Sequence, residues 1–94
     1  MAKHYTYALI DPRDLSCPIF YIGKGVAERR FQHFKASYPV DKRKNPDKMK
    51  VIDGIEAAGL KPQAIVLEWY ATAEAAYAGE KKYIEQYGLE ALTN

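Results

Sequence analysis

The chain has 94 residues, of which 48% are hydrophobic and 28% are charged, and its net charge is +2. This length leaves room for a single domain over residues 1–94, and such a chain buries roughly 60% of its unfolded surface. The composition excludes an intrinsically disordered chain. No run approaches the roughly 18 apolar residues of a membrane span, and the first residues lack the apolar core of a signal peptide. We therefore expect an intracellular protein with no membrane partner.

Cysteine usage and charge distribution narrow the function classes further. Cys17 is the only cysteine, which excludes an internal disulfide and a cysteine-based zinc site. Basic residues gather in the middle third of the chain: Lys35, Lys42, Arg43, Lys44, Lys48 and Lys50. On charge alone, a nucleic-acid-binding surface and an ordinary solvated face explain this group about equally well.

The first elements in the chain read as a hairpin. HYTYALI alternates with a period of two, which predicts a strand over residues 4–10. The turn-rich DPRDLSCP follows, and IFYI then predicts a second, antiparallel strand. We expect Leu9 to pair with Ile19. This register places Tyr7 opposite Tyr21, because the residue numbers of antiparallel partners keep a constant sum.

Helices and one more strand follow. Apolar residues at helical spacing predict a helix over residues 26–38, ended by a proline. KMKVIDGIEAAG predicts a second helix that ends at Gly59, and PQAIVLEWY predicts a third strand. Thr72 can cap a last helix that runs to about Tyr87. The predicted fold is α/β (α+β), a small three-stranded antiparallel sheet flanked by helices in the order β-β-α-α-β-α.

An acidic residue occupies an apolar position in the last predicted helix. Glu80 lies near the middle of a stripe formed by Ala73, Ala76, Tyr77, Ile84 and Tyr87. Desolvating an ionised carboxylate costs several kcal/mol unless it is paired or bound to a metal. A salt bridge, metal ligation and a stripe that is wet at this point all explain Glu80, and the salt bridge is slightly favoured. Gly79 costs about 1 kcal/mol relative to alanine inside a helix, which predicts that another group packs closely there.

The stretch FYIGKGVAERRFQH places glycines on both sides of Lys24. We interpret residues 23–25 as a strand-to-helix turn. Phosphate binding at a helix N-terminus is the alternative, but no Ser or Thr follows the lysine as a Walker loop requires. Tyr21, Lys24 and Arg29 form a second candidate group, because a neighbouring cation favours the phenolate of a tyrosine and makes it a better base. Arg29 and His33 are four residues apart and share a helix face.

These residues resemble the signature of the GIY-YIG endonucleases. YTY ending at Tyr7, followed after a turn by YIG at residues 21–23, is similar to the paired signature of that family. The further matches, in chain order, are Lys24, Arg29, His33, Glu80 and Asn94. The similarity covers nearly the whole chain and is closest to the nuclease domain of LEM-domain and ankyrin-repeat proteins. Two features depart from the family pattern: Tyr5 and Thr6 replace Gly and Ile of the first signature, and a second arginine, Arg30, follows the first.

The resemblance implies a metal-dependent endonuclease that hydrolyses a phosphodiester bond of DNA, in repair or recombination. In the family's mechanism Tyr7 would be the general base on the attacking water, with Tyr21 and Lys24 in support. Arg29 would stabilise charge on the phosphate, as charge-assisted contacts do where charge develops. His33 would be an auxiliary residue.

The same resemblance implies a divalent cofactor, Mg²⁺ (or Mn²⁺), held by Glu80 and otherwise by water and phosphate. We expect Glu80 to lie beside both signature tyrosines on a floor made by the sheet face. Gly23 and Asn94 would support the site, Asn94 by tying the terminus to it. Nucleic acid would also contact basic residues of the middle third: Lys35, Lys42, Arg43 and Lys44.

Other readings stay open. Tyr7 and Tyr21 are also explained as a plain cross-strand aromatic pair, and Arg30 as a stem packed over the core. A catalytically silent nucleic-acid-binding module is the alternative function, and a nucleotide-binding regulator is a third. The retained Tyr7, Arg29 and Glu80 favour the enzyme, because pure binding does not need a carboxylate that repels phosphate. RNA is left open as a substrate, and the end at Asn94 suggests a fragment, or a minimal nuclease that relies on another domain or on a homodimer.

Overall fold

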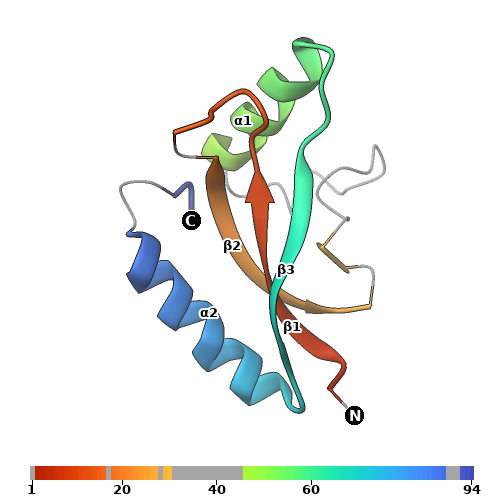
Figure 1. The fold of residues 1–94 in the computed structure, drawn as a ribbon, viewed down its shortest axis with the longest axis vertical. Coiled ribbons are helices and arrows are strands. Elements are labelled where there is room, and N and C mark those ends of the chain that lie inside the picture. The colour runs from red at the N-terminus through yellow and green to blue at the C-terminus, as the bar shows by residue number, and fades with distance from the viewer. Residues whose placement is uncertain (1, 17, 28, 31–45, 89–91) are drawn as a thin grey trace.

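The structure is a computed structural model that describes residues 2–16, 18–27, 29–30, 46–88 and 92–94. The elements in these residues are β1 (His4–Ile10), β2 (Ile19–Val26), α1 (Pro46–Ala57), β3 (Gln63–Tyr70) and α2 (Ala73–Tyr87). Their order agrees with the predicted α+β fold (Figure 1). Of the additional helix predicted over residues 26–38, residue 28 and residues 31–38 lie outside the described residues, and Val26 belongs to β2.

The three strands form one antiparallel sheet in the order β2-β1-β3, so that β1 is central. Tyr5, Tyr7 and Leu9 project to the face that α1 covers, where they pack with Ile52 and Ile55. The alternate residues of β1 project to the other face, where Ala8 packs in the cluster that includes Tyr83 and Ile84 of α2. The central strand is therefore buried on both faces, and two apolar clusters lie on opposite sides of one sheet.

The pairing of β1 with β2 differs from the predicted register. Tyr7 pairs with Gly23, and Tyr21 pairs with Leu9, so the predicted Tyr7–Tyr21 pairing is wrong by two residues. The register changes directly after Leu9, where β2 carries one extra residue. A shift of two residues keeps every side chain on its predicted face, because the side-chain period of a strand is two.

The GKG stretch belongs to β2, and the predicted strand-to-helix turn at residues 23–25 is wrong. Each glycine faces a tyrosine of β1: Gly23 pairs with Tyr7 and Gly25 with Tyr5. A Cβ on Gly23 would lie 2.5 Å from Cζ of Tyr7, and a Cβ on Gly25 would lie 3.3 Å from the Tyr5 hydroxyl. The strand continues through both glycines because the tyrosine rings occupy the space that side chains would fill.

The predicted bounds of α2 are confirmed. The Thr72 hydroxyl accepts a hydrogen bond from the Ala75 N–H at 3.1 Å, and Gly88 ends the helix with its N–H bonded to the Ile84 carbonyl at 2.8 Å. The predicted apolar stripe is wrong at its margins, since Tyr77 and Tyr87 are 49% and 39% exposed. No helix in the described part of the chain is long and apolar enough to cross a membrane.

Tyr70 explains the glycine inside α2. A Cβ on Gly79 would overlap the Tyr70 hydroxyl, so this face of the helix lies directly against the β3 tyrosine as expected. The Tyr70 and Tyr83 hydroxyls both donate to one carboxylate oxygen of Glu68, at 3.0 and 3.1 Å. These bonds raise the pKa of both tyrosines in addition to burial, and they lower the pKa of Glu68. Together they fix α2 against β3.

Candidate active site

Tyr7 and Tyr21 meet on the sheet face that α1 covers. The Tyr7 ring crosses the backbone of Gly23, its cross-strand partner. The ring centroids of the two tyrosines are 6.3 Å apart, and the ring planes are inclined by 42°. Tyr7 is only 4% exposed. The two tyrosines therefore share a face as predicted, and Gly23 sets the position of the Tyr7 ring.

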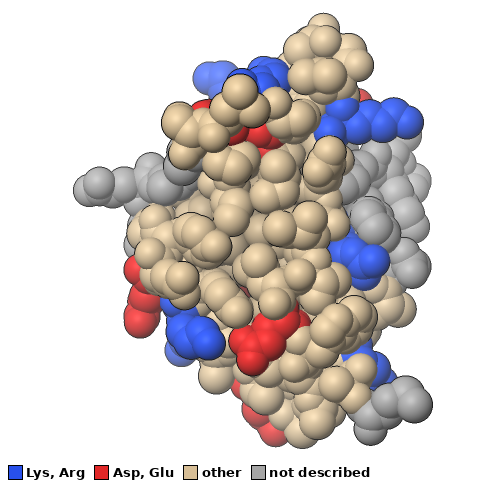
Figure 2. Space-filling view, viewed as in Figure 1, with Lys and Arg blue, Asp and Glu red and all other residues tan. Residues whose placement is uncertain are grey.

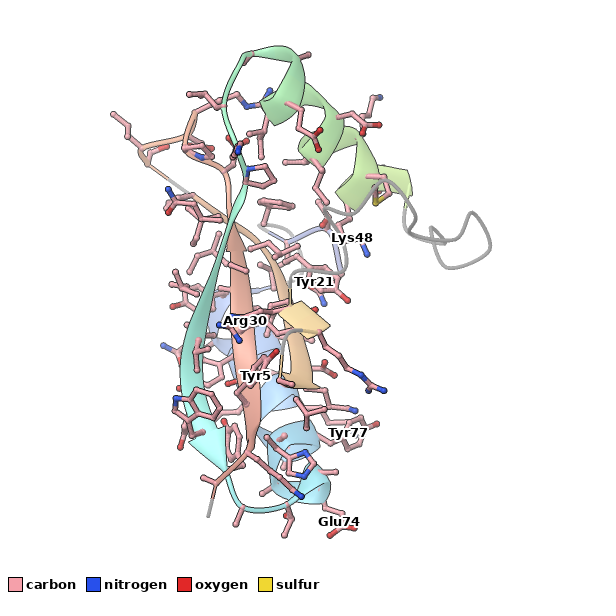
Figure 3. The ribbon with its side chains drawn as sticks, turned by 90° about the vertical axis from the view of Figure 1, so that its right-hand side faces the viewer. Tyr5, Tyr21, Arg30, Lys48, Glu74 and Tyr77 are labelled. Atoms are coloured by element: carbon pink, nitrogen blue, oxygen red, sulfur yellow. The ribbon has the colours of Figure 1, made fainter. Side chains whose placement is uncertain are left out.

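Lys48 of α1 completes this group, although it was not predicted as a site residue. Its Nζ lies 4.9 Å from the centroid of the Tyr21 ring, and Figure 3 shows the two side chains close together. Lys48 is buried, and burial lowers the pKa of its ammonium group. The signal was present in the sequence: Lys48, Ile52 and Ile55 follow the spacing of a buried helical stripe. We call Tyr7, Tyr21 and Lys48 the tyrosine cluster.

Glu80 lies at the edge of the sheet beside Lys24. Burial raises the pKa of the half-buried Glu80 carboxyl, whereas the Lys24 charge and a hydrogen bond from the Lys24 backbone lower it. Since β2 is an edge strand, this bond satisfies a backbone N–H along that edge. A salt bridge to a basic residue was the first alternative for Glu80, and Lys24 is a basic residue close to it.

The sequence led us to expect Glu80 beside both tyrosines on one sheet face. The structure instead places Glu80 and the tyrosines on different sides of β2. Lys24 follows Gly23 directly, and successive residues of a strand project to opposite faces. Lys24 and Glu80 thus lie on the α2 side, whereas the tyrosine cluster lies on the α1 side. Strand β2 separates the two groups and carries residues of both.

Arg29 lies with Lys24 at the end of β2. Both line a shallow depression of about 130 Å³, together with His4, Gly25, Val26, Ala73 and Ala76. The depression contains two cationic side chains and borders the first turns of α2, whose N-terminus adds partial positive charge. Its electrostatics suit an anionic group such as a phosphate. The other basic residues predicted for the site lie outside the described residues: His33, Lys35, Lys42, Arg43 and Lys44.

Asn94 binds the free edge of β2. Its Oδ1 accepts from the Ile22 N–H at 2.9 Å, and its Nδ2 donates to the Ile22 carbonyl at 2.7 Å. Thr93 donates its N–H and its hydroxyl to the Phe20 carbonyl, at 2.7 and 2.8 Å. The end of the chain therefore pairs with β2 next to the strand residues of both groups.

Tyr5 and Arg30 fix the segment that carries Arg29. The buried Tyr5 hydroxyl donates to the Ala27 carbonyl at 2.6 Å and accepts from the Arg30 N–H at 3.1 Å. The Arg30 guanidinium lies 5.2 Å from the centroid of the Tyr5 ring and donates to the same carbonyl at 3.0 Å. Both residues act in packing, as one of the sequence-based interpretations had it for Arg30.

The donor set at Glu80 suits only certain metals. The described residues contain no group of three or more His, Cys, Asp or Glu side chains that could hold a metal ion. A structural zinc ion, which needs four protein ligands, therefore does not fit them. Mg²⁺ keeps several waters and needs one or two carboxylates together with phosphate oxygens. Glu80 fits such an ion.

Comparison with known families finds one matching family model. The sequence model of the LEM-3-like GIY-YIG domain matches residues 4–94, which is nearly the whole chain. No curated protein and no solved structure matches the chain. The match begins at β1 and ends at Asn94, and it points to nuclease activity in general. The chain belongs to the family of LEM-3-like GIY-YIG domains.

Proposed function

We propose that the chain is a metal-dependent endonuclease that hydrolyses a phosphodiester bond of DNA. Membership of a GIY-YIG family supports a nuclease, and the tyrosine cluster is the observation that carries the proposal. Packing explains two adjacent rings, but it does not explain a buried lysine beside them. A free tyrosine has a pKa near 10 and is a weak base, and a nearby cation favours its phenolate.

In this proposal Tyr7 Oη accepts the proton of the attacking water. Tyr21 and Lys48 support this base, since the Tyr21 ring lies against both of the other members of the cluster and the Lys48 charge acts through space. Arg29 and Lys24 bind the phosphate at the depression between β2 and α2 and stabilise the charge that develops on it. The resemblance to the family implies that Lys24 supports the base, whereas in this proposal Lys24 binds the phosphate.

Glu80 would hold the divalent ion, Mg²⁺ or Mn²⁺, next to Lys24. When bound there, the ion supplies Lewis-acid stabilisation of the phosphate oxygens. The edge strand β2 contributes one residue to each group, Tyr21 to the tyrosine cluster and Lys24 to the phosphate site. A nucleic-acid strand that lies along this edge would contact both groups.

A catalytically silent DNA-binding module is the second candidate, and one observation favours it. Glu80 already accepts a hydrogen bond from the Lys24 backbone and lies on the α2 side of the sheet, away from the tyrosine cluster. In a silent module this carboxylate would only accept the hydrogen bond from the Lys24 backbone at the edge of β2.

Nicking of supercoiled plasmid with and without Mg²⁺ separates the two candidates. The enzyme converts the plasmid to the open circular form in Mg²⁺ or Mn²⁺ and stops when the metal is chelated. A silent module binds the plasmid in a mobility-shift assay under the same conditions and leaves it supercoiled. Binding without nicking in either metal would contradict the proposed function.

A further inference from the structure

Trp69 is the only tryptophan in the chain, and its side chain is 53% exposed near the end of β3. Single exposed apolar residues are common on protein surfaces, so exposure alone carries no inference. Two further properties distinguish Trp69: its fixed support and its position relative to the tyrosine cluster.

The support is the buried ring of Tyr5. Trp69 pairs with Tyr5 across the sheet, and their ring centroids are 5.3 Å apart at an interplanar angle of 73°. Tyr5 is fully buried and its hydroxyl is hydrogen-bonded to Ala27 and Arg30. The indole is thus held by a fixed ring on one side while half of its surface faces solvent. A partner that stacks on it needs little further ordering of the protein.

A cation also packs against the Tyr5 ring. The Arg30 guanidinium is 5.2 Å from the centroid of the Tyr5 ring, and Figure 3 shows Arg30 and Tyr5 on the sheet face that also carries Tyr21. Proteins bind unpaired bases by stacking them on exposed aromatic side chains, and a cation in the neighbourhood attracts the phosphates of the same strand. A purely apolar protein partner would gain nothing from the charge.

The position relative to the proposed base is defined by ring contacts. The centroids of Tyr5 and Tyr7 are 6.0 Å apart, so Trp69 is two ring contacts away from Tyr7 on one sheet face. With an axial rise of about 3.4 Å per nucleotide, this span corresponds to a base within roughly three nucleotides of the cleaved bond.

We propose that Trp69 stacks on an unpaired base next to the cleavage site, so that the substrate is DNA with a single-stranded stretch at that point. Bases inside a continuous duplex are stacked on both faces by their neighbours, and an indole reaches only a base that is unpaired or displaced. This inference rests on the proposed function, of which it specifies the substrate class.

The emission of Trp69 provides a direct test, because no other tryptophan contributes to it. The unmodified protein is titrated in EDTA, where no cleavage is needed, with a single-stranded oligonucleotide, a duplex of the same length and a duplex with a single-stranded gap. We expect the single strand and the gapped duplex to quench the emission and the intact duplex to leave it nearly unchanged.

Affinity measurements on variants complete the test. Trp69→Ala is expected to weaken binding of the single strand by roughly 5- to 150-fold, as loss of one stacked base does, with little change for the duplex. Trp69→Phe should restore part of the affinity. Tyr77→Ala is the matched control, because Tyr77 is a similarly exposed aromatic residue on α2, and it should change neither affinity.

Several results would overturn the inference. Equal quenching by duplex and single strand, or DNA binding with unchanged emission, excludes a stacked unpaired base at Trp69. An emission change that depends on protein concentration without DNA would show that a second copy covers the indole. The absence of binding to all three nucleic acids would also overturn the proposed function, which distinguishes the two failures.

Discussion

Tyr5 and Tyr7 pack in the same way but have different neighbours. Each ring faces a glycine of β2, Gly25 for Tyr5 and Gly23 for Tyr7. The Tyr5 hydroxyl is committed to two backbone groups of residues 27–30. A hydroxyl used in this way is a structural group, whereas Tyr7 lies next to Tyr21, whose ring in turn contacts the buried Lys48 cation. Within this pair, the surroundings of Tyr7 are those that suit a general base.

Glu80→Gln tests the role of the half-buried carboxylate. The amide oxygen can still accept from the Lys24 backbone, and the substitution removes the charge whose burial raises the pKa of Glu80. We expect the variant to be as stable as the parent protein or more stable at neutral pH, by thermal melting. It should lose Mg²⁺-dependent nicking and bind DNA equally well or more tightly.

The pH dependence of stability gives an independent check on the same residue. A raised folded-state pKa means that the folded protein binds the proton more tightly than the unfolded chain does. The stability contributed by Glu80 is then fully present below the unfolded pKa and is lost as pH rises through the folded pKa. Glu80→Gln should remove this loss. A large drop in melting temperature would instead show an essential ion pair with Lys24, and retained cleavage would exclude the metal role.

The two adjacent arginines should separate in function. Arg29→Ala is expected to abolish turnover, because Arg29 lines the depression with Lys24. Arg30→Ala should mainly lower the melting temperature, because its guanidinium lies over the Tyr5 ring and binds the Ala27 carbonyl. Nicking rates and melting curves of both variants decide the point. The opposite pattern would show that the family's arginine corresponds to Arg30.

At the scale of elements, the edge strand β2 depends on side chains and on the end of the chain for its hydrogen bonds. Asn94→Ala removes both bonds to the Ile22 backbone, and we expect a loss of about 1–3 kcal/mol in the free energy of unfolding. Amide hydrogen exchange at Ile22 should accelerate in the variant. Gln86→Ala, at an exposed position of α2, is the control and should change stability by less than about 0.5 kcal/mol. Unchanged exchange at Ile22 would contradict the structural role of Asn94.

Elements with local signals were predictable from the sequence, and those set by distant contacts were not. Thr72 and Gly88 mark the ends of α2 by capping chemistry that acts within a few residues. The continuation of β2 through Gly23 depends on the Tyr7 ring, which lies far away in sequence, so a local reading places a turn there. The β1–β2 register was also predicted wrongly, because the alternation of side chains along a strand does not reveal a bulge.

The candidate site was predictable in its residues more than in its arrangement. The odd positions of Glu80 and Gly79 in a helix indicated a close neighbour, which the structure identifies as Lys24 for one and Tyr70 for the other. The sheet face on which Glu80 lies depends on how α2 packs, and no local pattern encodes it. Lys48 was overlooked because a lysine in a basic segment suggests solvent, although its spacing with Ile52 indicates burial.

At the scale of the whole molecule, the described charges on the face drawn in Figure 2 do not form one continuous basic surface. Figure 2 shows the lysine and arginine side chains of one face in separate groups, with acidic residues between them. The net charge of +2 is small as well. Affinity for DNA must therefore come from local groups such as Lys24 with Arg29, and we expect a further contribution from the basic segment between residues 40 and 47.

Joint neutralisation of Lys42, Arg43 and Lys44 tests this contribution. We expect weaker DNA binding and a flatter dependence of log Kd on log salt, by about 0.9 for each phosphate that the protein no longer neutralises. Removal of the same number of charges at Lys61, Lys81 and Lys82, which are exposed elsewhere, is the control for net charge. If both triple variants keep the parent's salt slope, the segment is an ordinary solvated surface.

The rate of Mg²⁺-dependent plasmid nicking by Tyr7→Phe, measured beside the parent protein, tests the central claim most directly. Removal of a general base predicts a loss of at least about 100-fold, with a melting temperature close to that of the parent protein. Tyr5→Phe, which removes a hydroxyl with two hydrogen bonds, should lose stability and keep its cleavage rate at temperatures where it is folded. Nicking by folded Tyr7→Phe at nearly the parent rate would contradict the assignment of Tyr7 as the base.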